Sequence, residues 1–132
     1  MPHVFLYFYA FLKSWKARQQ AYEELSRKFR IADSPKDNIF WDYFETVKNF
    51  PLEANAVAQE AAISCLIAYL ECCDASIGKK LRPEITTYVI EKGLSAIKAG
   101  TRTKTFEVLM ILIELDVAEP VVTELTAFFT HK

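Results

Sequence analysis

Apolar residues recur at the spacing of one helix face along most of the chain, and no other feature restricts the fold as strongly. The spacing i, i+3, i+4, i+7 places side chains on one side of an α-helix. Two complete stripes are Phe40, Tyr43, Phe44 and Val47, and Ile63, Leu66, Ile67 and Leu70. The chain has only three glycines and five prolines, which is too few for the frequent turns of a small all-β domain. We therefore predict an all-α fold.

Polar N-caps and prolines divide the first half of the chain into helices. Ser14 is a suitable N-cap for a helix that ends near Arg30, because its hydroxyl can accept an N–H of the first turn. Ser34, with a proline after it, has the features of the next N-cap. We expect Pro51 to end that helix and Asn55 to cap the one that follows.

The second half of the chain is divided in the same way. We expect residues 74–82 to link two helices and Pro83 to open the second of them. Gly100 is expected to end that helix, and Pro120 to open the last one. The helix between them has an apolar stripe that consists of Phe106, Leu109, Met110 and Ile113.

The positions of the turns predict a repeat. Short turns at residues 13–15, 51–55 and 99–103 each precede the second helix of a hairpin, and these helices begin near residues 15, 55 and 102. The spacing lies within the ~40–47 residues that are typical of HEAT and armadillo hairpins. We predict an α-solenoid of about three and a half HEAT-like repeats, with all three turns along one edge.

The charge pattern indicates a basic edge on a nearly neutral chain. Lys and Arg number 16 and Asp and Glu 17, so the net charge of −1 argues against a dedicated nucleic-acid binder. The charged residues near the turns are Lys13, Lys16, Lys98, Arg102 and Lys104, with Glu53 as the one acid. Such an edge either attracts an acidic partner or is a solvated surface that aids solubility.

The N-terminal segment, residues 1–13, is apolar and rich in aromatic residues. Its nine consecutive apolar residues, 4–12, are too few to span a bilayer, which takes ~20. The segment also lacks the basic start and the cleavage site of a signal peptide. We expect an atypical first helix there and a single repeat domain over residues 14–132, with no membrane association.

Metal-binding and catalytic signals are weak. Cys65, Cys72 and Cys73 lie in one apolar stretch and are expected to be buried, reduced thiols in a reducing compartment. His3 and His131 lie near the two ends of the chain, so no ligand set for zinc is apparent. The sequence has no GxSxG, P-loop, GxGxxG or HExxH pattern and no interior histidine. We expect no enzyme activity, metal or cofactor.

Three short strings at the predicted turns resemble the TOG (tumour overexpressed gene) domain of the microtubule-polymerase family, most of all its first TOG domain. They are WKAR at 15–18 followed by YEEL at 22–25, NAVAQE at 55–60, and TRTK at 101–104 followed by Glu107. Each string alone is weak, but all three occur in order and at the turns. The resemblance extends from about residue 14 to about residue 128.

The resemblance implies a HEAT-repeat domain whose turn edge binds curved αβ-tubulin dimers and supports growth of microtubule plus ends. Trp15 matches the tryptophan that the family presents to β-tubulin, and Asn55 matches a polar residue of the second turn. Arg102 and Lys104 match the basic third turn, and Lys16 and Thr103 are adjacent matches. The implied location is the cytoplasm and the microtubule cytoskeleton, at spindle poles or kinetochores.

The chain also departs from the family pattern. It supplies fewer hairpins than a family domain, and the turns that reach α-tubulin in the family are absent from it, so we expect a partial domain that contacts mainly β-tubulin. Phe106 stands where the family tends toward a polar or basic residue. The alternative function is a general helical-repeat scaffold for another acidic protein, and binding to tubulin distinguishes the two.

Overall fold

The computed structural model describes residues 13–115 and 119–130, and within these ranges it is helical and contains no strand. The predicted helix in residues 1–12 lies outside the described part of the chain. The elements are α2 (Trp15–Arg30), α3 (Asn38–Asp42), α4 (Phe44–Val47), the 3₁₀ turn η2 (Phe50–Leu52), α5 (Ala56–Cys72), α6 (Ala75–Tyr88), the π-helical turn η3 (Val89–Gly93), α7 (Ala99–Leu115) and α8 (Glu119–Thr130). The all-α prediction is confirmed.

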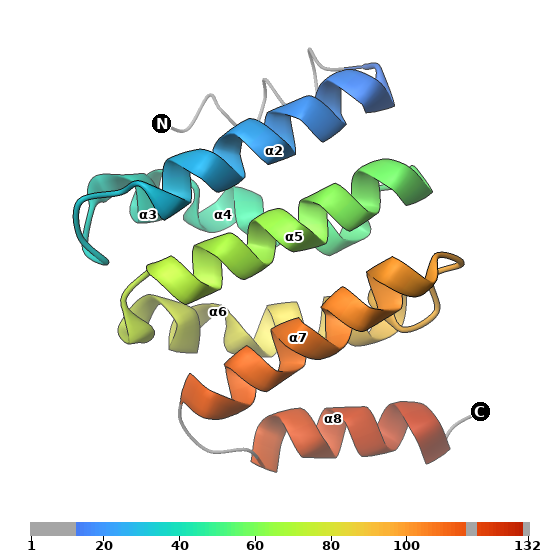
Figure 1. Ribbon diagram of the computed structural model, residues 1–132. Coiled ribbons are helices and arrows are strands. Elements are labelled where there is room, and N and C mark those ends of the chain that lie inside the picture. Colours follow the sequence, from blue (N-terminus) through green and yellow to red (C-terminus); the bar gives the residue numbers. More distant parts are fainter. Residues whose placement is uncertain (1–12, 116–118, 131–132) are drawn as a thin grey trace.

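The helices form two layers (Figure 1). In one layer α2 packs against α5 and α5 against α7, and all three begin at the same edge. In the other layer α3, α4 and α6 run back toward that edge, and α8 packs against α6 and α7. This is the stacked-hairpin architecture that the repeat spacing predicts. We call the edge where α2, α5 and α7 begin the turn edge: residues 13–14, 49–55 and 94–98 with the first two turns of each of these helices.

A cluster of aromatic residues fills the part of the core that lies far from the turn edge. The ring centroids of Phe29 and Phe40 are 5.7 Å apart, and Tyr69 packs edge-on against both, at 5.0 Å and 5.4 Å. The Tyr69 hydroxyl donates a hydrogen bond to the carbonyl of Phe40. A buried hydroxyl needs such a partner, so this bond fixes α3 on α5.

The predicted single helix after Ser34 is wrong in two respects. Asp37, not Ser34, is the N-cap: its Oδ1 accepts from the N–H of Ile39 at 2.9 Å. The helix is also interrupted at Tyr43 and continues as the short α4. Ser34 instead belongs to a turn in which its carbonyl accepts from the N–H of Asp37 at 3.0 Å. Aspartate is as good a cap as serine, and the position that the core needs decides between them.

Pro83 does not open a helix but lies inside α6, which begins at Ala75 with Asp74 as its N-cap. The predicted link over residues 74–82 is therefore helical. The reason is that Ile77, Leu81 and Ile85 are fully buried at helical spacing on both sides of the proline. Their burial offsets the cost of a proline in a helix interior, which is about 3 kcal/mol.

The buried face of α7 differs from the predicted stripe. Phe106 and Met110 are 47% and 54% exposed. The residues of α7 that face the core are Thr101, Thr105, Val108, Leu109 and Leu112. Two threonines replace large apolar residues because the turn η3 comes very close: a Cβ atom on Gly93 would lie 2.0 Å from Oγ1 of Thr105.

Gly93→Ala is therefore expected to destabilise the fold by about 1–3 kcal/mol, the usual cost of overpacking a core. Gly100→Ala is the matched control. A Cβ there would meet only the end of the flexible Glu60 side chain, at 2.4 Å, and alanine suits a helix better than glycine. Urea unfolding, monitored by circular dichroism, measures the stability of the two variants. A Gly93→Ala midpoint equal to that of the unchanged chain would contradict the close packing of η3 on α7.

The three cysteines are free thiols, and Cys65 and Cys73 are buried as the sequence predicts, whereas Cys72 is only half-buried. Burial raises the pKa of Cys65 to about 12 and that of Cys73 also to about 12. Because the thiolate is the reactive form, both are inert packing residues at neutral pH.

Candidate functional site

The first part of the turn edge is the start of α2. Ser14 caps the helix as predicted, and its Oγ accepts from the N–H of Ala17 at 3.5 Å. Trp15 is half-buried and packs with part of its ring against the core. The Nζ of exposed Lys16 lies 5.6 Å from the centroid of the Trp15 ring, a cation–π distance. The two residues thus form one surface that is apolar and positively charged.

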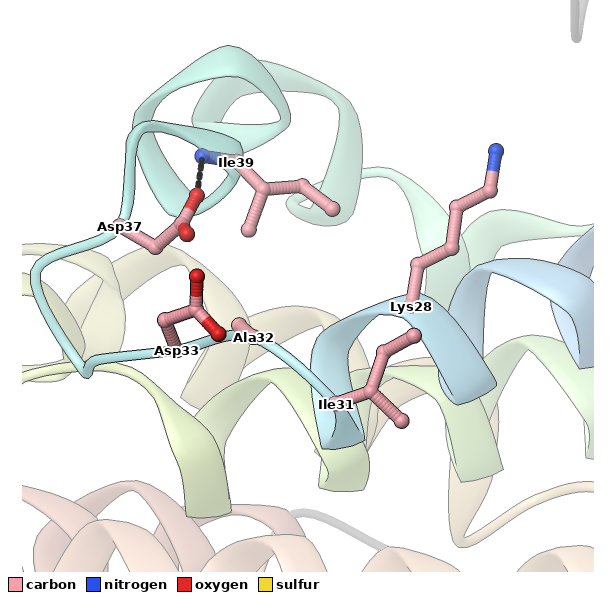
Figure 2. Close-up of a pocket in the computed structure, with 6 residues that line it drawn as sticks. All are labelled: Lys28, Ile31, Ala32, Asp33, Asp37 and Ile39. Atoms are coloured by element: carbon pink, nitrogen blue, oxygen red, sulfur yellow. Dashed lines mark hydrogen bonds between the residues drawn. The ribbon is translucent and has the colours of Figure 1, made fainter.

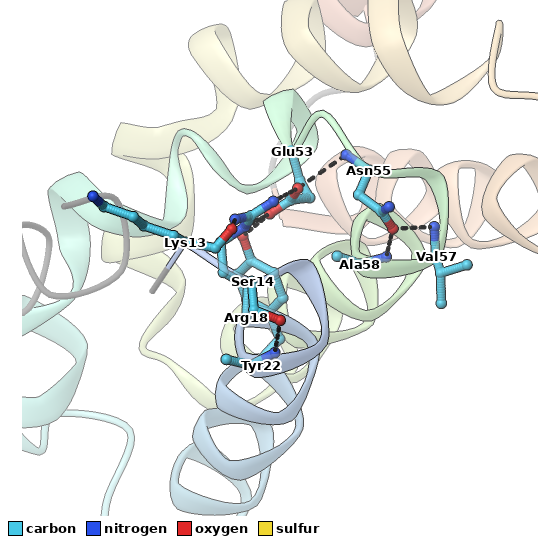
Figure 3. A network of polar contacts seen from close by, with 9 residues as sticks. Lys13, Ser14, Arg18, Tyr22, Glu53, Asn55, Val57 and Ala58 are labelled. Carbon is cyan, nitrogen blue, oxygen red and sulfur yellow. Dashed lines mark hydrogen bonds and ion pairs between the residues drawn. The ribbon is translucent and has the colours of Figure 1, made fainter. Parts of the chain in front are cut away.

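A buried carboxylate joins the first two turns (Figure 3). The side chain of Glu53 is only 2% exposed, and its Oε1 and Oε2 accept from Nε and Nη2 of Arg18 at 2.8 Å and 2.9 Å. The Tyr22 hydroxyl donates to Oε1 at 2.8 Å, and Nη1 of Arg18 donates to the carbonyl of Lys13 at 3.0 Å. This network fixes the turn before α2 against the turn before α5.

Asn55 completes the network from the second turn. Its backbone N–H donates to Oε2 of Glu53 at 3.0 Å, and its side-chain Oδ1 accepts from the N–H groups of Val57 and Ala58 at 2.9 Å and 3.0 Å. Asn55 is therefore the N-cap of α5, as predicted, and its side chain is half-exposed. Nearby, Nε2 of Gln59 donates to the carbonyls of Pro51 and Lys92, at 3.0 Å and 3.3 Å, and so ties the second turn to η3.

The network keeps Glu53 ionised. Burial alone would raise the pKa of this carboxyl, but the hydrogen bonds from Arg18, from the N–H of Asn55 and from Tyr22 together outweigh it and lower the pKa below its ordinary 4.5. At neutral pH the site is a buried, fully hydrogen-bonded ion pair, and removal of one partner is expected to be costly.

The lowered pKa of Glu53 predicts a loss of stability in acid. The contribution is fully present above the pKa of the unfolded chain and is lost as the pH falls through the lower folded-state pKa. We expect the urea midpoint to fall on acidification below about pH 4.5, and to fall less steeply in Glu53→Gln, which has no carboxyl to protonate there. Equal steepness in the two chains would show that Glu53 does not carry this dependence.

The third turn consists of residues 94–98, and α7 begins at Ala99. The predicted turn over 99–103 is therefore placed too late: Arg102, Thr103 and Lys104 lie within the first two turns of α7. Gly100 does not end a helix but lies in the first turn of one. The sequence misplaced this boundary because glycine, a common helix stop, is also tolerated in an exposed first turn.

Arg102 holds the third turn in place. Its Nη1 donates to the carbonyls of Ala96 and Ile97 at 2.7 Å and 2.8 Å. Nζ of Lys98 lies 3.4 Å from Oε1 of Glu60 and joins this turn to α5. Two basic residues of the edge, Lys98 and Arg18, are therefore paired with carboxylates, of Glu60 and Glu53.

The structure thus places all six predicted site residues on the turn edge, but only some of them contact one another. Trp15 and Lys16 are in contact, and Asn55 is joined to α2 through Glu53. Arg102, Thr103 and Lys104 start α7, where Arg102 and Lys104 are half-buried and Thr103 is exposed. Thr103 also lines a surface groove of about 390 Å³, together with Glu71, Phe106, Glu107, Met110 and Ile111.

Sequence reasoning missed the apolar residues of the turn edge. Ile97 is 90% exposed at the third turn, and Leu52 and Val57 are exposed at the second. The predicted turn at 99–103 left Ile97 inside the helix that was expected to end at Gly100, so the misplaced boundary hid it; an apolar residue in the actual turn, where polar residues are usual, would have been the signal. With Trp15 at the first turn, each of the three turns carries at least one accessible apolar side chain.

A second hollow lies at the opposite edge, beyond the end of α2 (Figure 2). It has a volume of about 250 Å³ and is lined by Lys28, Ile31, Ala32, Asp33, Asp37 and Ile39. No group of three or more His, Cys, Asp or Glu residues that could bind a metal occurs in the described part of the chain. Over residues 13–115 and 119–130, none of the helices combines the length and apolar character that a bilayer span needs.

These features define a class of protein: an α-solenoid of stacked helical hairpins whose candidate binding residues follow the turns of one edge. Residues 12–132 match the family model of the XMAP215/Dis1/CLASP TOG domain. The chain belongs to this family, and the resemblance that its turn strings indicated is confirmed.

Individual relatives agree with this assignment. The chain is 38% identical over 113 residues to the spindle pole body component alp14 of Schizosaccharomyces pombe, a match that covers 83% of the chain and 14% of alp14. It is 32% identical over 113 residues to centrosomal protein 224 of Dictyostelium discoideum, covering 86% of the chain and 6% of that protein. It is 27% identical over 113 residues to the protein mini spindles of Drosophila melanogaster, covering 86% of the chain and 5% of that protein. The chain thus spans a small part of each relative's length.

A solved structure agrees as well. It comes from work on the "Structural Basis of Tubulin Recruitment and Assembly by Microtubule Polymerases with Tumor Overexpressed Gene (TOG) Domain Arrays". The chain superposes on it with a TM-score of 0.76 and 31% sequence identity, over 85% of this chain and 24% of the other. The prediction of a HEAT-like solenoid is thereby confirmed.

Proposed function

We propose that this chain is a tubulin-binding module that holds curved αβ-tubulin dimers through its turn edge and supports growth at microtubule plus ends. The observation that carries the proposal is the likeness, over 85% of the chain, to a TOG structure from work on tubulin recruitment. The turn edge supports it, because its three turns are tied together by Arg18–Glu53 and Lys98–Glu60 and so can meet a partner as one rigid surface.

The proposed binding residues are Trp15, Lys16, Asn55, Arg102, Thr103 and Lys104. Trp15 supplies an apolar anchor, and Lys16 and Lys104 supply positive charge that speeds encounter with an acidic surface. The turns present in this chain are expected to reach mainly β-tubulin. The module acts by binding alone, with no catalytic step and with no membrane or nucleic acid as a partner. The relatives named for spindle poles and centrosomes support a cytoskeletal location for it, at microtubules of the spindle pole or kinetochore.

The test measures binding of the purified chain to soluble αβ-tubulin. Size-exclusion chromatography detects the complex, and kinetic measurements at two salt concentrations give the rates of association and dissociation. We expect a complex whose association slows as salt rises. An equally acidic unrelated protein is the control. Equal binding to that protein would favour the general scaffold over the tubulin module, and absence of binding to tubulin would reject the proposal.

A further inference from the structure

We propose that Ile97 is an apolar contact to tubulin at the tip of the third turn, and that Arg102 is the residue that positions it. This inference rests on the proposed function and adds to it an apolar contact far from Trp15. It also gives Arg102 a role besides that of a positive charge.

The first observation is the exposure of Ile97. The residue is 90% exposed, the largest value among the exposed large apolar residues in the described part of the chain. The next is Ile31, at 78%, which lies at the opposite edge. Single exposed apolar residues are common on protein surfaces, so exposure alone does not identify a contact. The position of Ile97 on the proposed binding edge and the order of its loop are what distinguish it.

The second observation is that the loop around Ile97 is fixed. Nη1 of Arg102 bridges the carbonyls of Ala96 and Ile97 at 2.7 Å and 2.8 Å. Two further bonds close the loop on η3: the N–H of Ala96 donates to the carbonyl of Gly93 at 3.2 Å, and Oγ of Ser95 donates to the carbonyl of Glu91 at 2.7 Å. A β-branched side chain on such a loop has little conformational freedom to lose on binding, which favours affinity.

The surroundings of Ile97 resemble a small interface centre. Ala96 precedes it and Lys98 follows it in the loop, with Ser95 one residue further away, so the only large apolar side chain among residues 95–98 is that of Ile97. Residues that contribute most to binding are typically apolar or aromatic and are enclosed by polar neighbours that exclude water once the partner is bound.

The geometry gives Arg102 a second role. One of its nitrogens is engaged by two carbonyls of the loop, and one of these belongs to Ile97 itself. Removal of Arg102 therefore takes away two of the hydrogen bonds that hold the loop and loosens the part that presents Ile97. Part of the affinity lost in Arg102→Ala is then the contribution of Ile97.

The test of Ile97 compares Ile97→Ser with Ile31→Ser in binding to soluble αβ-tubulin. We expect Ile97→Ser to weaken binding about tenfold, mainly through faster dissociation and by the same factor at low and high salt, because an apolar contact is not screened. Ile31→Ser changes the same residue type at similar exposure on the far edge (Figure 2) and is expected to leave the affinity within about twofold.

The test of Arg102 is a double-mutant cycle. Arg102→Ala should weaken binding clearly in the unchanged chain and by a smaller factor in Ile97→Ser, because the positioned side chain is already gone. Arg102→Lys keeps the charge but lacks the planar guanidinium that spans the two carbonyls, so it should restore only part of the loss. A purely electrostatic Arg102 would give equal factors in both backgrounds and full rescue by lysine, and either result would overturn the positioning role.

The outcomes separate the two proposals. If the unchanged chain binds tubulin and Ile97→Ser binds equally well, the inference about Ile97 is wrong and the proposed function stands. The inference about Ile97 is also wrong if Ile31→Ser weakens binding as much as Ile97→Ser. If the unchanged chain does not bind tubulin, the proposed function fails, and the inference with it.

Discussion

Glu53→Gln is expected to lower the free energy of unfolding by about 3 kcal/mol, the lower end of the range for breaking a buried ion pair. Glutamine has nearly the same shape, so the loss comes from charge: Arg18, whose side chain is only 18% exposed, keeps its positive charge without the carboxylate that balances it. The contacts from Tyr22 and from the N–H of Asn55 are also weakened, because a neutral oxygen is a poorer acceptor than a carboxylate. Urea unfolding at pH 7, followed by circular dichroism, measures the change.

Glu24→Gln is the matched control for this variant. Glu24 also faces an arginine, Arg27, at 2.6 Å, but both side chains are mostly exposed to water. Exposed pairs of this kind contribute about 0–1 kcal/mol. A Glu53→Gln chain no less stable than Glu24→Gln would show that the carboxylate at residue 53 is not what joins the first two turns.

Trp15→Ala is expected to reduce the affinity for soluble αβ-tubulin about thirtyfold or more, which corresponds to ~2 kcal/mol for the truncation of an aromatic anchor. The loss should appear mainly as faster dissociation, since the net charge of the edge is unchanged. Because part of the ring packs against the core, we also expect a moderate loss of stability. Binding kinetics are therefore measured at a temperature where circular dichroism shows the variant to be folded.

Trp41→Ala provides the comparison. Trp41 is 49% exposed and lies in α3, beside the far end of α2, and its ring packs against Phe44 at 5.3 Å. Its removal takes away an accessible tryptophan from outside the turn edge and should change tubulin affinity by less than about twofold. If Trp15→Ala loses its helical signal, Trp15 is a core residue. If it stays folded and binds as tightly as Trp41→Ala, the turn edge does not bind tubulin through Trp15.

Where the sequence predicted helices correctly, a cap and an apolar stripe agreed. Ser14 and Asn55 each precede a helix that buries one face, and both are N-caps in the structure. Local chemistry and packing favour the same boundary at these two positions, so either signal alone would have found it.

Two of the errors occur where a residue that often marks a helix boundary lies within a helix. Pro83 and Gly100 are common markers of helix boundaries, yet Pro83 lies between the buried residues Leu81 and Ile85, and Gly100 lies in the first turn of α7. In α7 nearly every face is apolar, so the pattern alone does not show which side is buried. The close approach of η3 decides it, and that contact comes from a different part of the chain.

The candidate site was predictable as a set of positions but not as a set of contacts. Turn spacing and the TOG resemblance place Trp15, Asn55 and Arg102 on one edge. That Asn55 caps a helix with its side-chain oxygen, and that Arg102 bridges two carbonyls, depends on side-chain directions that only the folded chain defines. The exposure of Ile97 also depends on the folded chain and could not be predicted from the sequence.

The parallel order of α2, α5 and α7 has an electrical consequence. Each helix has a dipole equivalent to roughly half a positive charge at its N-terminus, and all three N-termini lie on the turn edge (Figure 1). The backbone therefore adds to the positive potential of that edge, with a contribution that no side-chain substitution removes. It also makes lysines and arginines there unfavourable for stability by some tenths of a kcal/mol each. Lys16 lies in the first turn of α2, where the helix dipole alone would favour an acidic residue, so at this position the edge trades a little stability for an electric field that points toward its partner.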